Sequence, residues 1–293
     1  MFIATLIAAG RLSSGDISLA EQALEGAGVH HVGRSWIEED KACDLLIAAM
    51  PEAARQALEG LISGVDVIVQ GEAARRKRLL VADMDSTMIG VECIDELADY
   101  AGIKAEVAAV TERAMRGELE FEAALEARVA LLKGLDEAIL TRCHEERVRV
   151  TPGARALVRT MRRDGAGCLL VSGGFTHFAD KVAKEIGFSR AISNRLGLAK
   201  GKLDGSVAKP IVGAAAKKEA LLAAIASSGI EPGQSLAVGD GANDIPLLEA
   251  AGLGVAYHAK PATAAAADAR IEHCDLTALL YAQGYARSDW EAD

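Results

Sequence analysis

Short apolar runs and helical stretches follow one another in two different orders along this chain, and the order changes near residue 75. In the first part, apolar runs and period-two alternation predict four strands, and 3.6-residue periodicity predicts two helices. The strands are expected at residues 2–8, 32–38, 43–49 and 65–70, and the helices at 18–26 and 52–63. The resulting order, βαββαβ, is typical of a ferredoxin-like fold. We therefore expect a ferredoxin-like domain over residues 1–73.

From residue 79 onward, short apolar runs alternate with longer helical stretches. Strands are expected at residues 79–83, 167–172, 235–239 and 252–255. Consecutive apolar residues are typical of strands buried on both faces, as in a parallel sheet with helices on each side. We therefore predict an α/β fold with a doubly wound, Rossmann-like parallel sheet, built from residues 79–90 and 150–280.

The stretch between the first two of these strands is helical throughout. Four helices are expected there, at residues 92–100, 105–116, 121–132 and 136–148. A helical block inserted after a strand would cover the strand ends, so residues 91–149 are interpreted as a cap over an active site. Glycines spaced through residues 193–207 predict a further hairpin excursion.

Composition and charge exclude several classes of protein. The chain has 293 residues, 51% of them hydrophobic, and a net charge of -10. No apolar run approaches the roughly 20 residues that cross a bilayer, and no basic leader opens the chain, so we expect a cytoplasmic protein without a membrane partner. The only basic cluster is short, which argues against nucleic acid. The five scattered cysteines form no Cys-x-x-Cys pair, which is typical of reduced buried thiols.

Two groups of carboxylates follow predicted strands. Asp83 and Asp85 come at the end of the apolar run that starts at Leu79, and Asp240 and Asp244 follow the run that starts at Ser235. The carboxyl ends of parallel strands meet at one edge of a sheet, so three or four oxygen ligands can converge there. Hard oxygen ligands suggest Mg²⁺.

Four separated motifs lie at or near strand ends. They are Asp-Met-Asp-Ser-Thr at 83–87, Val-Ser-Gly-Gly-Phe at 171–175, a lysine in Ala-Lys-Lys-Glu at 216–219, and Gly-Asp-Gly-Ala-Asn-Asp at 239–244. In this order they resemble the haloacid-dehalogenase-like phosphohydrolase superfamily from residue 79 to about residue 275. Each motif by itself would be a weak signal, because strand-to-helix turns with glycine pairs are common.

This resemblance implies a reaction with an aspartyl-phosphate intermediate. Asp83 would be the nucleophile. Asp85 would protonate the leaving group and then activate water. Mg²⁺ would be held by the Asp83 carboxylate, the backbone carbonyl of Asp85, and Asp240, with Asp244 as a ligand or an orienting group.

The remaining core motifs would hold the phosphoryl group. Ser172 and the amide of Gly173 would donate hydrogen bonds to it, and Asn243 would contact it or the rest of the substrate. Lys217 would supply a balancing positive charge, although the adjacent Lys218 competes for that role.

The predicted cap carries residues that could recognise a small zwitterion. Glu92 begins the first cap helix, and Phe121 and Arg128 are seven residues apart on another, so they share one face. An acid can pair with an ammonium group, an arginine can bind a carboxylate, and Phe121 with Met115 can exclude water. Together with the core motifs, these residues resemble the phosphoserine phosphatases, whose bacterial members often carry an extra amino-terminal domain. The resemblance implies Mg²⁺-dependent hydrolysis of O-phospho-L-serine to L-serine and phosphate, the last step of serine biosynthesis.

Two alternatives stay open. The same core could act on another small phosphorylated metabolite, or Asp83 could be phosphorylated for signalling, although Asp85 argues against a long-lived acyl phosphate. The pattern of residues 1–73 resembles an ACT domain. Such a domain could support a homodimer or bind an amino-acid effector such as serine.

Overall fold

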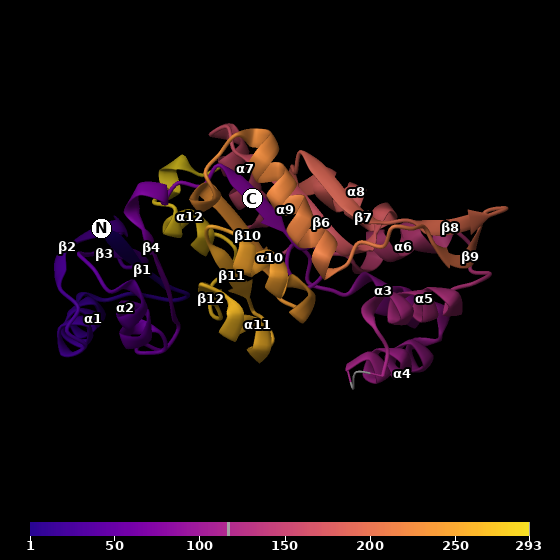
Figure 1. The fold of residues 1–293 in the computed structure, drawn as a ribbon, viewed down its shortest axis with the longest axis horizontal. Coiled ribbons are helices and arrows are strands. Elements are labelled where there is room, and N and C mark those ends of the chain that lie inside the picture. The colour runs from indigo at the N-terminus through magenta and orange to yellow at the C-terminus, as the bar shows by residue number, and fades with distance from the viewer. Residues whose placement is uncertain (116–117, 293) are drawn as a thin grey trace.

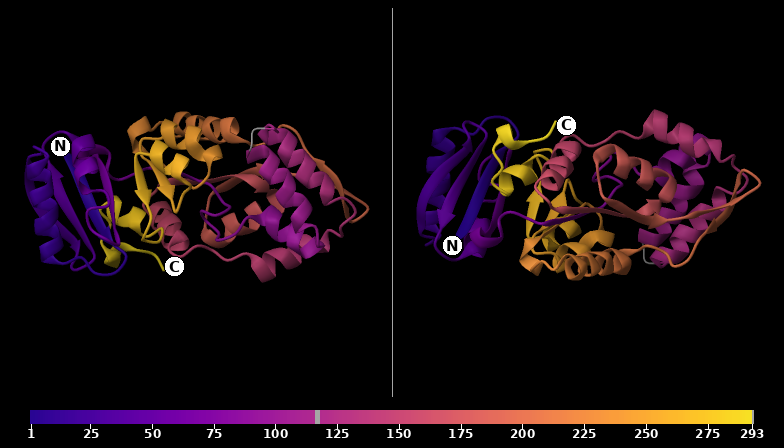
Figure 2. Two further views of the ribbon diagram at one scale, coloured as in Figure 1. Left: turned by 90° about the horizontal axis from the view of Figure 1, so that it is seen from below. Right: turned by 90° about the horizontal axis from the view of Figure 1, so that it is seen from above.

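The computed structural model describes residues 1–115 and 118–292 of an elongated molecule with three parts (Figure 1). A small four-stranded sheet with two helices lies at one end, and a group of helices lies at the other. A larger six-stranded sheet lies between them. The views from below and from above show the same arrangement (Figure 2). Within the described residues, no helix combines the length and the apolar character that crossing a bilayer requires.

The amino-terminal part has the predicted ferredoxin-like fold. Its elements are β1 (Phe2–Ala8), α1 (Ser14–Gly26), β2 (His31–Glu38), β3 (Ala42–Ile47), α2 (Pro51–Leu58) and β4 (Val65–Gly71). The antiparallel strands lie in the order β2-β3-β1-β4. The side chain of Ser13 accepts a hydrogen bond from the backbone N–H of Asp16, which caps α1 and starts this helix earlier than the apolar pattern indicates.

The central sheet confirms the predicted doubly wound α/β fold. Its strands, all parallel, lie in the order β12-β11-β10-β5-β6-β7. They are β5 (Leu79–Ala82), β6 (Gly167–Phe175), β7 (Arg190–Asn194), β10 (Ser235–Gly239), β11 (Gly254–Tyr257) and β12 (Ala269–Ile271). The pattern missed β7 and β12 because both are edge strands: β7 carries polar residues, and β12 has three residues.

Helices cover both faces of this sheet. Leu80 and Ala82 of β5 pack in one cluster with α7 (Ala154–Arg163), α8 (Thr176–Ile186) and α12 (Ala278–Ala282). Leu79 and Val81 point to the other face, where α9 (Ala214–Ser228) and α10 (Ile245–Ala250) cover them. The short α11 (Pro261–Ala266) follows β11. Because β5 is buried on both faces, the loop that follows Ala82 begins at a fixed place, at the carboxyl edge of the sheet.

The helical insertion forms the predicted cap. Its helices are α3 (Cys93–Ala101), α4 (Lys104–Met115), α5 (Phe121–Leu131) and α6 (Ala138–Arg147). The predicted hairpin is also present, as β8 (Leu196–Ala199) and β9 (Lys202–Val207). It reaches out to the cap (Figure 1), where the backbone of Leu203 bonds with Gly134 and Leu135. The cap is therefore supported by a segment far away in the sequence.

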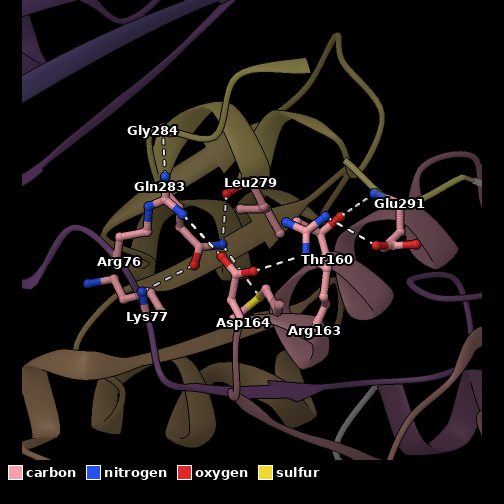
Figure 3. A network of polar contacts seen from close by, with 10 residues as sticks. Arg76, Lys77, Thr160, Arg163, Asp164, Leu279, Gln283, Gly284 and Glu291 are labelled. Carbon is pink, nitrogen blue, oxygen red and sulfur yellow. Dashed lines mark hydrogen bonds and ion pairs between the residues drawn. The ribbon is translucent and has the colours of Figure 1, made fainter. Parts of the chain in front are cut away.

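The amino-terminal part is fastened to the central sheet by polar contacts. Asp66 of β4, which is 4% exposed, accepts hydrogen bonds from the backbone N–H groups of residues 272–274. The connecting segment is held by the end of α12, where Lys77 N donates to Gln283 Oε1 and Arg76 donates to the carbonyl of Gly284 (Figure 3). Asp66 and Lys77 thereby find partners for buried polar groups across the junction, so the two parts pack as neighbours.

Candidate active site

A cavity of about 580 Å³ lies between the cap and the carboxyl ends of β5, β6 and β10. Ligands of open α/β sheets bind at this edge, where loops from several strands converge. Most of the residues singled out in the sequence line it: Asp83, Asp85, Ser172, Gly173, Asp240 and Asn243 from the core, and Glu92, Phe121 and Arg128 from the cap. Lys217 and Asp244 lie beneath its floor, and the side chain of Met115 lies outside the described residues.

Asp83 is placed by the buried strand β5. It is 5% exposed, and its backbone N–H still donates to the carbonyl of Val238 on the neighbouring β10. Its side-chain Oδ1 lies 2.7 Å from Lys217 Nζ and accepts a hydrogen bond from the N–H of Met84 at 2.8 Å. One oxygen is thereby held by two donors, which fixes the orientation of the carboxylate.

Lys217 is a fully buried cation between two carboxylates. It comes from the first turn of α9, and its Nζ lies 2.7 Å from both Asp83 Oδ1 and Asp244 Oδ1. Burial opposes its charge, but Asp83 and Asp244 outweigh burial and raise the pKa of the ammonium group above its ordinary value. The neighbouring Lys218 is exposed. Of the two adjacent lysines, the chosen Lys217 therefore points to the carboxylates, whereas its competitor Lys218 points to solvent.

Asp244 organises the loop after β10. Its Oδ1 faces Lys217, while Oδ2 accepts hydrogen bonds from the N–H groups of Asp240 at 3.2 Å and Gly241 at 3.0 Å. A Cβ on Gly239 would lie 2.4 Å from the carboxyl carbon of Asp244, so only glycine fits at that position. The loop that carries Asp240 is therefore shaped by a buried carboxylate.

Three carboxylates form a cluster that fits a divalent cation. One oxygen each from Asp83, Asp240 and Asp244 lies within 4.8 Å of the others. Burial and the charge of Asp244 raise the pKa of Asp240 to about 6, while a hydrogen bond from Thr87 at 3.0 Å opposes this shift. Lys217 supplies one positive charge against three carboxylates, and hard oxygen donors with excess negative charge are the ligands that Mg²⁺ prefers.

The carboxylate of Asp85 lies apart from this cluster, towards the cap. Its Oδ1 accepts a hydrogen bond from the N–H of Cys93 at 3.3 Å. Burial and the nearby charge of Glu92 raise the pKa of Asp85 to about 7. A Cβ on Gly174 would lie 2.7 Å from Asp85 Oδ2, so the glycine leaves the room that this carboxylate occupies. The two carboxylates of one motif therefore have different surroundings.

The loop after β6 is fixed by an asparagine that the sequence analysis missed. Asn194 Nδ2 donates to the carbonyls of Gly173 at 2.8 Å and Val212 at 3.2 Å, and its Oδ1 accepts from the N–H of Val212. Ser172 Oγ accepts from the N–H of Gly174. A polar residue at the end of a strand is the kind of signal that would have identified Asn194. It was missed because the apolar pattern did not predict the edge strand β7, which ends at this residue.

The cap contributes an acid, an arginine and an aromatic ring. Glu92 is the residue before α3, and its Oε1 accepts a hydrogen bond at 2.7 Å from Ser86, whose backbone has a positive φ of 54°. The Phe121 ring lies over the backbone of Gly173 and Gly213, where added Cβ atoms would meet it at 3.4 and 3.1 Å. The first residue of the cap's third helix thus contacts the core loop beneath it.

Arg128 lies in the last turn of α5 and is half-buried. Its Nε donates to the carbonyl of Ala124 at 3.2 Å. Burial lowers the pKa of its guanidinium, while the charges of Asp95 and Glu92 oppose this shift. Asp95, in the first turn of α3, also lines the cavity and was missed in the sequence, although it lies only three residues after Glu92.

The chain is similar to known proteins in sequence and in structure. Residues 80–249 match the model of the haloacid dehalogenase-like hydrolase family. A phosphoserine phosphatase of Streptomyces coelicolor is 45% identical over 238 residues, which are 80% of this chain and 58% of that protein. One of Albidiferax ferrireducens is 46% identical over 223 residues, covering 73% of this chain and 94% of that protein.

A solved structure is similar along almost the whole chain. It is the unliganded form of a probable phosphoserine phosphatase from Vibrio cholerae, with a TM-score of 0.79 and 33% sequence identity. The match covers 98% of this chain and 88% of that one. The similarity therefore includes the amino-terminal part as well as the sheet and the cap.

Proposed function

The chain belongs to the haloacid dehalogenase-like hydrolases, and we propose that it hydrolyses O-phospho-L-serine to L-serine and phosphate as the last step of serine biosynthesis. One observation carries the choice of substrate: Glu92 and Arg128 line the same cavity as Asp83, so an acid and a guanidinium are within one cavity with the proposed nucleophile. The names of the similar relatives support the same substrate. The five cysteines, all buried and free of disulfides, support a reducing compartment such as the cytoplasm.

In the proposed reaction, Asp83 attacks the phosphorus atom with the oxygen that Lys217 does not hold. The bond from phosphorus to the serine oxygen breaks, and Asp85 gives its proton to that oxygen. Water then attacks the phosphorus, Asp85 takes a proton from it, and phosphate leaves with Asp83 restored. The separate position of Asp85, outside the carboxylate cluster, supports this division of roles.

The chain holds the phosphoryl group from several sides. Ser172 and the N–H of Gly173 would donate to its oxygens, Asn243 would contact it from the next loop, and Lys217 would offset its charge from below. Asp83, Asp240 and the backbone carbonyl of Asp85 would hold Mg²⁺, with Asp244 orienting the loop, and the bound ion would neutralise phosphoryl oxygens.

The cap would recognise the amino-acid part of the substrate. Arg128 would bind the carboxylate with two parallel hydrogen bonds, and Glu92 would pair with the ammonium group. Phe121, lying over Gly173, would cover the site and exclude water. Arg128 and Glu92 would each match one charge of the serine part. A substrate without the carboxylate or without the ammonium group would therefore leave one of these two residues without its partner.

A substrate panel tests the proposal. With Mg²⁺ present, kcat/KM is measured for phosphoserine, phosphothreonine and phosphoethanolamine, of which the last lacks the carboxylate. We expect phosphoethanolamine to be poorer than phosphoserine by about 100-fold or more, because Arg128 is left unpaired. Equal values for the two would refute the assigned substrate. Release of only one serine per chain, with the phosphate retained on Asp83, would instead favour the signalling alternative.

A further inference from the structure

The side chains that line the cavity include more carboxylates than cations. The carboxylates that line it are Asp83, Asp85, Glu92, Asp95 and Asp240, whereas the cations among its described lining residues are Arg128 and Lys260. A phosphate monoester brings further negative charge into this cavity. An exposed positive group at this cavity favours the approach of such a ligand.

Lys260 is anchored beside the carboxylate cluster. It lies between β11 and α11, as the residue just before α11. Its backbone N–H donates to the carbonyl of Asp240 at 3.2 Å. Pro261, the first residue of α11, restricts the backbone here. The root of the Lys260 side chain is thereby fixed next to Asp240, on the core side of the cavity.

The side chain of Lys260 is free to follow a ligand. It is exposed, and no ion pair involves it among residues 1–115 and 118–292. Arg128, in contrast, is half-buried on the cap side, near the charges of Asp95 and Glu92. Lysine is a compact point charge on a flexible four-carbon chain, which suits a phosphate that must enter and leave.

We propose that Lys260 is a substrate-contacting residue that attracts the phosphate of the incoming monoester at the core side of the cavity and contacts the phosphate product before it leaves. This inference rests on the proposed phosphatase function, but it needs only a phosphate monoester and not serine in particular. Lys260 was absent from the motifs singled out in the sequence because it follows β11, two strands away from β5 in the sheet.

Charge substitutions at Lys260 test this role, with Lys184 as a matched control. Lys184 is an exposed lysine in the last turn of α8, and this helix runs away from the cavity edge of β6. The variants are Lys260→Ala, Lys260→Glu and Lys260→Arg, alongside Lys184→Ala and Lys184→Glu. For each we measure kcat/KM from low to high ionic strength, the inhibition constant of inorganic phosphate, and the thermal midpoint of unfolding.

At low salt we expect Lys260→Ala to lower kcat/KM by about tenfold and Lys260→Glu to lower it further, with the loss shrinking as salt screens the charge. Lys260→Arg should restore most of kcat/KM. The inhibition constant of phosphate should rise about tenfold in Lys260→Ala, whereas the control variants and the thermal midpoints should stay unchanged.

Two outcomes would overturn the inference. One is that the Lys260 and Lys184 variants behave alike in kcat/KM and in phosphate inhibition. The other is a loss in kcat with a lowered thermal midpoint but no salt dependence, which would assign Lys260 to support of the Asp240 loop only. If the wild type does not hydrolyse phosphoserine, the proposed substrate fails, yet phosphate inhibition of aryl phosphate hydrolysis still tests Lys260.

Discussion

The core side of the cavity, its floor, and the cap side, its roof, are built in different ways. On the floor, Asp83, Lys217 and Asp244 are each at most 5% exposed and are joined by contacts of 2.7 Å. On the roof, Phe121 is 36% exposed, and Arg128 donates to a backbone carbonyl of its own helix. The difference indicates that the groups proposed for phosphoryl transfer are oriented before a ligand arrives, whereas the groups proposed for recognition would gain partners from the ligand.

The largest effect is expected on the floor of the cavity, where Asp83→Asn tests whether Asp83 is the nucleophile. The amide has nearly the same shape but is a poor nucleophile and weakens the contact with Lys217. We expect turnover of phosphoserine to fall by about 10⁴-fold or more, as for other variants without their nucleophile. Phosphate release over many hours measures this loss, and circular dichroism checks the fold. A variant that keeps a tenth of the wild-type rate would rule out Asp83 as the nucleophile.

The second test compares two adjacent lysines. Lys217→Met removes the cation between two buried carboxylates, so the free energy of unfolding should fall by about 3–5 kcal/mol. Lys218→Met, at an exposed position, should change it by no more than about 0.5 kcal/mol. Urea unfolding of the two variants and the wild type measures both values. Similar losses in the two would contradict the buried ion-pair arrangement.

The roof is tested by Arg128→Ala with two substrates. For phosphoserine we expect kcat/KM to fall by about 100-fold, because the substrate carboxylate loses a bidentate partner. An aryl phosphate without a carboxylate should lose far less. Steady-state kinetics on both substrates gives the ratio, and an equal loss on both would show that Arg128 does not bind the carboxylate.

The smallest effect is expected where the cap meets the core. His177 of α8 lies 2.9 Å from Lys181 Nζ and 3.3 Å from Thr141 Oγ1 of α6, and burial together with Lys181 lowers the pKa of His177 to about 4. An unfolded histidine titrates near pH 6.5, so between these values only the unfolded chain takes up the proton. The free energy of unfolding should therefore fall as the pH drops from about 6.5 towards 4.

Urea unfolding at pH 7 and at pH 5 measures this effect, with His177→Gln as the comparison. The glutamine keeps a polar group of similar length but does not titrate, so its free energy of unfolding should depend less on pH over this interval. An identical pH dependence in the two proteins would show that His177 does not link the cap–core contact to pH.

Local patterns were sufficient for the main elements of the fold. The buried strands β5, β6 and β10 are runs of apolar residues, and the carboxylates that follow β5 and β10 stand beside these runs in the chain. Because parallel strands align their carboxyl ends, the pattern places Asp83 and Asp240 at the same edge of the sheet. That β10 lies directly beside β5 is a result of the structure. The edge strands β7 and β12 lack such runs, since only one neighbour pairs with each of them.

The sequence by itself determined that a ferredoxin-like part precedes a doubly wound sheet with an inserted cap, and that carboxylates end two of its strands. Only the tertiary structure decided which side chains share an environment: that Lys217 is buried while Lys218 is exposed, that Asn194 joins two loops, and that Lys260 stands beside Asp240. The physical reason is that apolar periodicity is a local property of the chain. Burial, hydrogen-bond partners and nearby charge depend on residues that folding brings together from distant positions.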